Sequence, residues 1–269
     1  MDLKSIDVVI ADRQGEVHIN AEIDEPAALA IEAALDLLFG YYHFSAILLR
    51  LNSNGGQLTG LMHIYGTMAT WRARGKHIRT AAGFRAASAA ALLLSLGEIG
   101  ERQVLTHSTV LFHHVRVDAS GVAITSRSAG KIFDSLQRHD KHLIGGLLQH
   151  IESGIGGHAA AAAEGRARCA LLYGRVSRPK EIILGNSSCT RPKWLAAVSR
   201  IYDKCSSVDS LSPYAVYLNR RFALDSAMDL REAYALMLID SIRGVPDLVP
   251  EARLIHQAVP AKWPSRLAP

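Results

Sequence analysis

The chain has 269 residues and a formal net charge of +5, with hydrophobic residues at 49% and charged residues at 20%. These values are typical of a soluble globular protein of one large domain, or a domain with an appendage, that buries a sizeable core. The Lys and Arg residues are scattered along the chain, whereas a nucleic-acid-binding protein gathers them into a stripe. We therefore expect no nucleic-acid partner.

The ends and the cysteines of the chain give no targeting or metal signal. Residues 1–7 (MDLKSID) lack the basic region and apolar run of a signal peptide, and no stretch approaches the roughly 18 apolar residues of a membrane span. The three cysteines, Cys169, Cys189 and Cys205, are an odd and widely spaced set. Neither a disulfide framework nor a metal site is indicated, so we expect no metal, no membrane anchor and a cytoplasmic location.

The first part of the chain alternates predicted strands and helices. Residues 17–23 alternate apolar and polar positions like a strand, and Asp24 and Pro26 are start signals for a helix that ends at Gly40. The apolar run 46–52 (AILLRLN) is typical of a buried strand in a parallel sheet. The following elements are a turn over 52–56, a helix over 58–71, a strand over 77–82, an apolar helix after Ser88 and a strand over 109–112. This order predicts an α/β fold with a largely parallel sheet.

The second part of the chain contains a region of different character. Residues 128–151 have the periodicity of a long helix. Residues 154–209, with their alanine run and scattered Arg, Ser and Pro, indicate an inserted helical subdomain with helices near 160–172 and 194–202. Regular patterning resumes near Pro213, followed by a helix within 232–242 that leads to a closing strand. We divide the chain into a core (1–153), an insertion (154–209) and a return to the core with a proline-rich tail (210–269).

Ser88 and His113 are the first candidates for chemistry. Ser88 starts a helix within a cluster of small residues, and His113 stands at the end of the next buried strand. A hydroxyl at a helix start can meet an imidazole on a neighbouring strand and become an activated nucleophile. Each residue also has a structural explanation, because Ser is a common helix cap and His at a strand end is usually structural. The Gly55-Gly56 turn permits a positive φ and a close approach, but such turns are common.

Four motifs, in order along the chain, resemble one known family. Residues 47–56 (ILLRLNSNGG) resemble its apolar strand ending in Asn-Ser-Pro-Gly-Gly, and residues 64–68 (IYGTM) resemble its Ile-Tyr-Asp-Thr-Met helix. Residues 86–102 are similar to its nucleophile helix and following turn, and residues 111–113 (LFH) to its Met-Ile-His strand. The family is the ClpP-type serine peptidases, the proteolytic subunits of Clp proteases. The resemblance implies the ClpP/crotonase fold of repeated β-β-α units, here with a helical insertion before the last catalytic segment.

The resemblance also implies site residues. Residues 225–233 (DSAMDLREA) resemble the family segment Asp-x-x-Met-Ser-x-x-Glu-Ala, which makes Asp225 the acid of a Ser88, His113 and Asp225 triad. The backbone N–H groups of Gly55 and Ala89 match the family's oxyanion donors.

The residues alone leave several of these assignments open. Asp225 could equally be a helix N-cap, and Asp229 and Asp240 are weaker alternatives for the acid. His114 is a second candidate for the base. The chain also departs from the family pattern at Asn54, where the family has Pro, and at Phe84, where the family has Gly.

The implied function is a serine endopeptidase that cleaves polypeptides through an acyl-enzyme and needs no cofactor. The resemblance implies a ring-forming homo-oligomer, with the helix over 128–151 in the ring-stacking position, and leaves a Clp ATPase partner open. One alternative is a catalytically impaired ring subunit or scaffold, which the departure at Phe84 and the insertion favour. A weaker alternative is a crotonase-like acyl-CoA enzyme, whose chemistry needs neither Ser88 nor His113.

Overall fold

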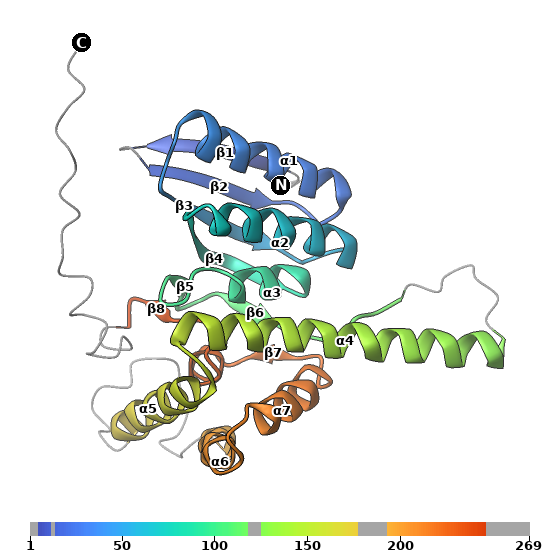
Figure 1. Cartoon of the computed structure of the whole chain (residues 1–269), viewed down its shortest axis with the longest axis vertical. Coiled ribbons are helices and arrows are strands. Elements are labelled where there is room, and N and C mark those ends of the chain that lie inside the picture. The colour runs from blue at the N-terminus through green and yellow to red at the C-terminus, as the bar shows by residue number, and fades with distance from the viewer. Residues whose placement is uncertain (1–4, 12–13, 118–124, 177–192, 246–269) are drawn as a thin grey trace.

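A twisted sheet carries helices on one face, and a long helix crosses beside it and projects from the body (Figure 1). This computed structural model describes residues 5–11, 14–117, 125–176 and 193–245. The strands are β1 (Ser5–Ala11), β2 (Gln14–Asn20), β3 (Ala46–Ser53), β4 (His77–Ala87), β5 (Arg102–Leu105), β6 (Thr109–Leu111), β7 (Ala227–Met228) and β8 (Ser241–Arg243). The helices are α1 (Glu25–Leu35), α2 (Leu58–Ala73), α3 (Ala89–Ser95), α4 (Ser126–Ile155), α5 (His158–Val176), α6 (Lys193–Val208), α7 (Ser212–Phe222) and α8 (Leu230–Ala235).

The sheet is parallel through its centre, which confirms the predicted α/β fold. Its main path is β1-β2-β3-β4-β5-β8, and each successive pair from β2 to β8 on that path is parallel. The antiparallel pairs are β1 with β2 and β6 with β7. Alternate side chains of β3 are buried and pack with the buried faces of α1 and α2, which forms the core that the apolar runs predict.

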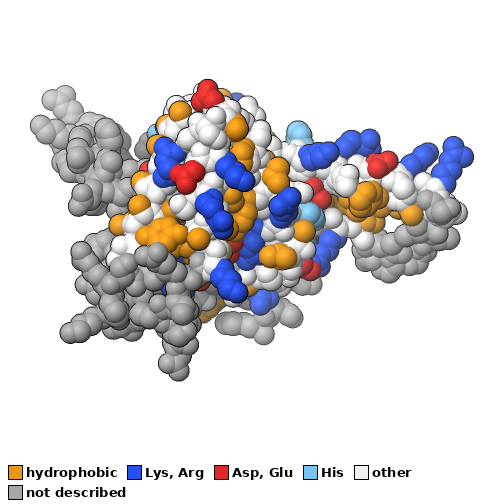
Figure 2. Space-filling model, turned by 90° about the horizontal axis from the view of Figure 1, so that it is seen from below, with side chains coloured by type: hydrophobic (Ala, Val, Ile, Leu, Met, Phe, Trp, Pro, Cys, Tyr) orange, Lys and Arg blue, Asp and Glu red, His pale blue; other side chains and the backbone are white. Residues whose placement is uncertain are grey.

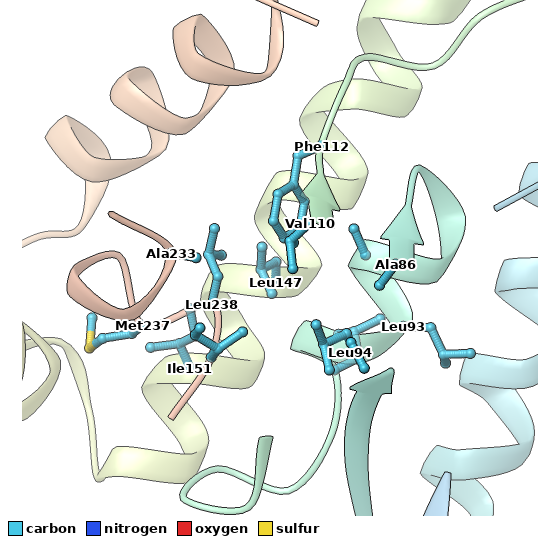
Figure 3. Packing of buried hydrophobic residues seen from close by; sticks show 14 of the residues in the cluster. Ala86, Leu93, Leu94, Val110, Phe112, Leu147, Ile151, Ala233, Met237 and Leu238 are labelled. Carbon is cyan, nitrogen blue, oxygen red and sulfur yellow. The ribbon is translucent and has the colours of Figure 1, made fainter. Parts of the chain in front are cut away.

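Strand β4 is the element that positions the candidate site. Its first half, at Thr80 to Ala82, pairs with β5, and its last residues, Arg85 to Ala87, pair with β6. Because β4 runs directly into Ser88 and β6 runs on towards His113, this split pairing brings the two segments side by side. Figure 3 shows Ala86 of β4 beside Val110 of β6, with Phe112 two residues further along the chain.

Several element boundaries differ from the sequence predictions. Asp24 caps α1 as predicted, accepting the N–H of Ala27 at 2.9 Å, but the helix becomes a π-helical turn, Asp36–Tyr41, before it ends. Strand β1, before the first predicted strand, is an addition. The predicted helix within 232–242 is only the short α8, which gives way to a buried turn where Met237 has φ of 54°. A left-handed residue cannot continue a right-handed helix.

The helices of the predicted insertion share the core of the rest of the protein. Gly165 of α5 packs on the ring of Tyr202 of α6, where a Cβ would lie 2.3 Å from the ring, and Ala161 and Ala162 are fully buried. The Tyr202 hydroxyl donates to the carbonyl oxygen of Ala235 in α8 at 2.8 Å. The alanine run therefore allows close helix packing. The division at 153/154 and 209/210 stays a prediction about sequence segments, and the proline-rich tail lies outside the described residues.

A buried ion cluster joins α5 to the sheet. The Asp240 carboxylate accepts from Arg102 Nε at 2.7 Å and Nη2 at 2.9 Å, and from Arg168 Nη2 at 2.9 Å. All three side chains are buried. Burial raises the pKa of Asp240, but the two guanidinium groups more than offset this and hold it well below its usual value. The backbone N–H groups of Gly100, at 2.7 Å, and of Arg102, at 3.2 Å, also donate to this carboxylate.

The surface carries mixed charge, as the composition suggests. On the face seen in Figure 2, Lys and Arg side chains are interspersed with hydrophobic and acidic ones, and several more lie along the projecting arm. Among the described helices, none is both long enough and apolar enough to cross a membrane.

The stability of the α4 contact should depend on pH through His150. Burial lowers the pKa of His150 to about 4, although its hydrogen bond with the Gly97 carbonyl oxygen at 2.8 Å acts in the opposite direction. A His with a depressed folded-state pKa stabilises the fold above its unfolded pKa, near 6.5, and this contribution is lost as the pH falls towards 4. We expect the free energy of unfolding to fall by up to about 3 kcal/mol across that window.

Chemical unfolding of the protein and of His150→Gln at several pH values tests this. Gln does not titrate and keeps a donor for Gly97, so its curve should lack the His150 component. Identical pH dependence in the two proteins would contradict the prediction.

Candidate active site

A cavity of about 1380 Å³ lies at the carboxyl ends of β2, β3 and β4. Ser88 and His113 both line it, together with Gly55 and Gly56 of the 52–56 turn. Ligands bind outside the carboxyl ends of parallel strands in many α/β proteins, because successive turns converge there. Residues far apart in the sequence thus face one hollow.

Ser88 has the backbone of a sharp strand-to-helix turn. Its φ is 55° and its ψ −125°, a combination that non-glycine residues rarely adopt, and its N–H donates to the carbonyl oxygen of Leu111 at 2.8 Å. Ser88 occupies the N-cap position of α3, but its side chain makes no capping hydrogen bond. The helix-cap explanation of this serine is therefore wrong, and a strained backbone at such a turn is typical of functional residues.

The ring of His113 is held in one tautomer. Its Nδ1 lies 2.6 Å from the carbonyl oxygen of His114, and because a carbonyl only accepts, Nδ1 carries the proton. In the neutral ring, Nε2 is then left as the proton acceptor. His114 does not line the cavity; its Nε2 bonds the carbonyl oxygen of Asn219 in α7 at 2.8 Å. Of the two histidines, only His113 faces the hollow that holds Ser88.

In the described part of the chain, Asp225 makes no hydrogen bond with His113 and does not line the cavity with it. It follows α7 with φ of 49°, and its carboxylate pairs with the guanidinium of Arg116. Asp229, by contrast, caps α8 through Arg231, and Asp240 belongs to the buried ion cluster. Within the described ranges, Asp225 is thus the candidate acid that pairs only with an exposed side chain.

The 52–56 turn lies directly against Ser88. A Cβ on Gly55, which has φ of 95°, would lie 2.5 Å from the Ser88 Cβ and 2.9 Å from the Ala89 nitrogen, so only glycine fits. The Gly55 N–H, however, already donates to the Ser53 Oγ at 3.0 Å. The Gly56 N–H has no acceptor among the described residues. The Gly55 N–H, predicted from the sequence as an oxyanion donor, is therefore already engaged by Ser53, whereas the Gly56 N–H is free within the described residues.

Sequence reasoning missed several residues that shape the cavity. The side chain of Arg85 donates to the Asn54 Oδ1 at 2.9 Å, and Phe84 is 69% exposed with its ring 5.4 Å from that of His107. Arg85, Phe84 and His107 all line the cavity. Asn54 and Phe84 were visible as departures from the family pattern, but their partners come from other segments. Among the described residues no cluster of three or more His, Cys, Asp or Glu could hold a metal ion.

A comparison with protein families matches residues 4–153 to the model of the Clp protease family, described as "Clp protease". The chain belongs to the Clp protease family. The recognition made from sequence motifs is thereby confirmed. The match ends near the end of α4, so it covers strands β1 to β6, Ser88 and His113 but not β7, β8 or Asp225.

Individual relatives agree with this assignment. The chain is 32% identical over 166 residues to an ATP-dependent Clp protease proteolytic subunit 4 of Rhodococcus jostii, covering 54% of this chain and 84% of that protein. It is 40% identical over 97 residues to a proteolytic subunit 1 of Corynebacterium glutamicum, covering 36% of this chain. A proteolytic subunit 1 of Tropheryma whipplei is 36% identical over 105 residues. The chain spans only 45% and 49% of the lengths of the last two relatives.

Because the 52–56 turn packs closely on Ser88, we expect alanine to destabilise the protein at Gly55 but not at Gly66. Gly55→Ala places a methyl group against Ser88 and forces a left-handed alanine, so we expect the free energy of unfolding to fall by about 2 kcal/mol or more. Gly66→Ala is the matched control, because a Cβ there meets nothing within 4 Å and the position is helical. It should stabilise the helix by up to about 1 kcal/mol. Denaturant unfolding of both variants measures the difference, and equal stabilities would refute the packing argument.

Proposed function

We propose that this chain is a ClpP-like serine endopeptidase with Ser88 as nucleophile, His113 as base and Asp225 as acid. The single observation that carries the proposal is Ser88: its hydroxyl caps nothing, its backbone is strained, and it shares a cavity with His113. Membership of the Clp protease family supports the peptidase chemistry.

The geometry supports an acyl-transfer mechanism. With Nδ1 protonated, the Nε2 of His113 can take the Ser88 proton as the oxygen attacks a peptide carbonyl. The same nitrogen then protonates the leaving amine, which leaves an acyl group on Ser88. Water activated by His113 would release the acyl group and restore the enzyme.

The oxyanion of the intermediate needs backbone donors. Ala89 is the first residue of α3, where N–H groups have no partner within the helix. Its nitrogen lies beside the 52–56 turn, so its N–H and one from that turn can converge on one point. We propose Gly56 as the second donor in this arrangement, with Gly55 able to serve only after releasing Ser53. One such donor lowers the activation barrier by about 3 kcal/mol.

The acid requires a local rearrangement in this scheme. Asp225 would leave Arg116 and accept from the Nδ1 of His113, which would release the His114 carbonyl. The present arrangement is also the observation that favours the second candidate function, a catalytically impaired ring subunit. In that case the acid would stay with Arg116.

The wider biology of the proposal follows the family. We propose polypeptide substrates, a ring-forming homo-oligomer and a cytoplasmic location, with the projecting α4 (Figure 1) in the ring-stacking position. The matched relatives are named as subunits of ATP-dependent proteases, and a Clp ATPase is accordingly the proposed partner.

Labelling with a fluorophosphonate probe tests the nucleophile. The protein should form a covalent adduct on Ser88, and Ser88→Ala should abolish both the adduct and peptide hydrolysis while the melting temperature is kept. Ser207→Ala is the control, since that hydroxyl is exposed and donates to the carbonyl oxygen of Lys204. Labelling that persists in Ser88→Ala would disprove the assignment, and a folded protein that never labels would favour the impaired subunit.

The exchange of partners at Asp225 gives opposite effects for two variants. Asp225→Asn should lower kcat by about 10⁴-fold, because the acid orients the base and stabilises its charged form. Arg116→Gln should raise kcat, because it removes the competing partner. The pair is exposed and worth at most about 1 kcal/mol, so the gain should not exceed about fivefold. Steady-state hydrolysis of a fluorogenic peptide measures both, and a loss of rate in Arg116→Gln would count against the exchange.

A further inference from the structure

The charged side chains that line the active-site cavity lie near two different strands, one on each side of β3. Arg85, from the end of β4, is the only Lys or Arg among the described residues that line it. The carboxylates are Glu22 and Asp24, from the connection between β2 and α1. Strand β3 separates β2 from β4, so positive and negative charge lie on opposite sides of the 52–56 turn.

The positive charge of Arg85 is not neutralised. Its recorded partner is the amide oxygen of Asn54 at 2.9 Å, and no carboxylate among the described residues pairs with it. A guanidinium has five N–H donors in a planar fork that matches a carboxylate. One of these donors serves Asn54, so most of the fork is free in an exposed position.

The hydrogen bond with Asn54 places the Arg85 guanidinium near Ser88. It directly precedes Gly55, whose Cβ position would lie 2.5 Å from that of Ser88. Arg85 itself lies on β4, three residues before Ser88, which directly follows that strand. A substrate group that bonds Arg85 would thus lie close to the bond that Ser88 attacks.

The carboxylates on the other side differ in their freedom. Asp24 is occupied, because its Oδ1 accepts from the Ala27 N–H at the start of α1. Glu22 is exposed and has no hydrogen bond or ion pair within the described residues. A peptide in the cavity therefore meets repulsion for carboxylates near β2 and attraction for them near Ser88.

We propose that Arg85 is a specificity determinant that selects peptides carrying a carboxylate next to the scissile bond. The carboxylate could be an acidic side chain or the free C-terminus of a short peptide, since the guanidinium recognises both alike. The inference rests on the proposed peptidase function for its kinetic part, while its binding part stands without hydrolysis.

The kinetic test uses peptides that differ at one position. Amidated fluorogenic peptides carry Glu, Gln or Lys at each of the two positions on either side of the cleaved bond. A second pair differs only in a free or an amidated C-terminus, which separates the two sources of the carboxylate. At the preferred position, kcat/KM for Glu should exceed that for Gln about threefold to tenfold, and added salt should reduce this ratio.

Variants separate charge from structure, because the ratio cancels any loss common to both peptides. Arg85→Gln keeps a donor for Asn54 but loses the charge, so the ratio should fall to about one. Arg85→Lys should restore most of it. Glu22→Gln is the matched control on the opposite side, and it should keep the Glu preference while lowering any preference for Lys. A ratio unchanged in Arg85→Gln, in protein that still labels at Ser88, overturns the proposal.

The binding test distinguishes this proposal from the proposed function. Fluorescence anisotropy with Ser88→Ala protein measures the affinity of the Glu and Gln peptides without cleavage. A preference for the Glu peptide that disappears in the Ser88→Ala, Arg85→Gln double variant supports the proposed role of Arg85. This holds even if the wild-type protein neither labels nor hydrolyses peptides, a result that would reject only the proposed peptidase function. Equal affinities in Ser88→Ala, or no binding of any peptide, overturn the role of Arg85.

Discussion

The buried carboxylate of Asp240 between two guanidinium groups is the interaction on which the arrangement of the rest depends. Arg102 begins β5, Asp240 precedes β8, and Arg168 belongs to α5, so one cluster joins the sheet to the helices that follow α4. Removing one member of such a cluster leaves an uncompensated buried charge, which costs several kcal/mol. The guanidinium of Arg168 also donates to the carbonyl oxygens of Tyr234 and Ile239 and lies 4.7 Å from the Tyr234 ring centroid. The cluster therefore fixes α5 and the turn after α8 against β5, and β5 in turn pairs with the strand that ends at Ser88.

The sequence was informative where the determinants are local. The apolar run of β3, the cap at Asp24 and the small residues around Ser88 each act within a few positions, and the structure has a strand, a helix start and a tight turn there. The ion cluster could not be predicted in this way, since Arg168 reads as a surface residue between Ala167 and Cys169 until its distant partner is known. The same holds for Gly165 of α5, because the need for a glycine there arises from the ring of Tyr202 in another helix.

The candidate site shows the same limit at the level of single atoms. A sequence motif identifies the residues of the 52–56 turn but not the acceptor of each N–H. In the structure the Gly55 N–H donates to the Ser53 hydroxyl oxygen, and the Gly56 N–H has no acceptor among the described residues. Likewise, the match at 225–233 selects Asp225 but is silent about Arg116, which lies on a segment more than a hundred positions away. Hydrogen-bond partners depend on angles and distances set by tertiary packing, and spacing along the chain does not encode them. Residue types were predictable at this site, whereas their bonding states were not.

An aromatic contact bears on whether the proposed acid, Asp225, can reach the proposed base, His113. Phe112, which directly precedes His113, stacks on Phe222 at the end of α7, with ring centroids 4.9 Å apart and planes within 6°. Phe222 lies three residues before Asp225, so the stack joins the segment that carries His113 to the one that carries Asp225. Both rings are buried, and an aromatic pair adds about 1 kcal/mol beyond the burial itself. Helix α7 is further held by the Tyr214 hydroxyl, which donates to the carbonyl oxygen of Leu236. In the proposed exchange, the Asp225 carboxylate would leave Arg116 for His113 while this stack holds the two backbones. The long sequence separation between His113 and Asp225 therefore does not by itself argue against the proposed triad, because the stack joins the segments that carry them.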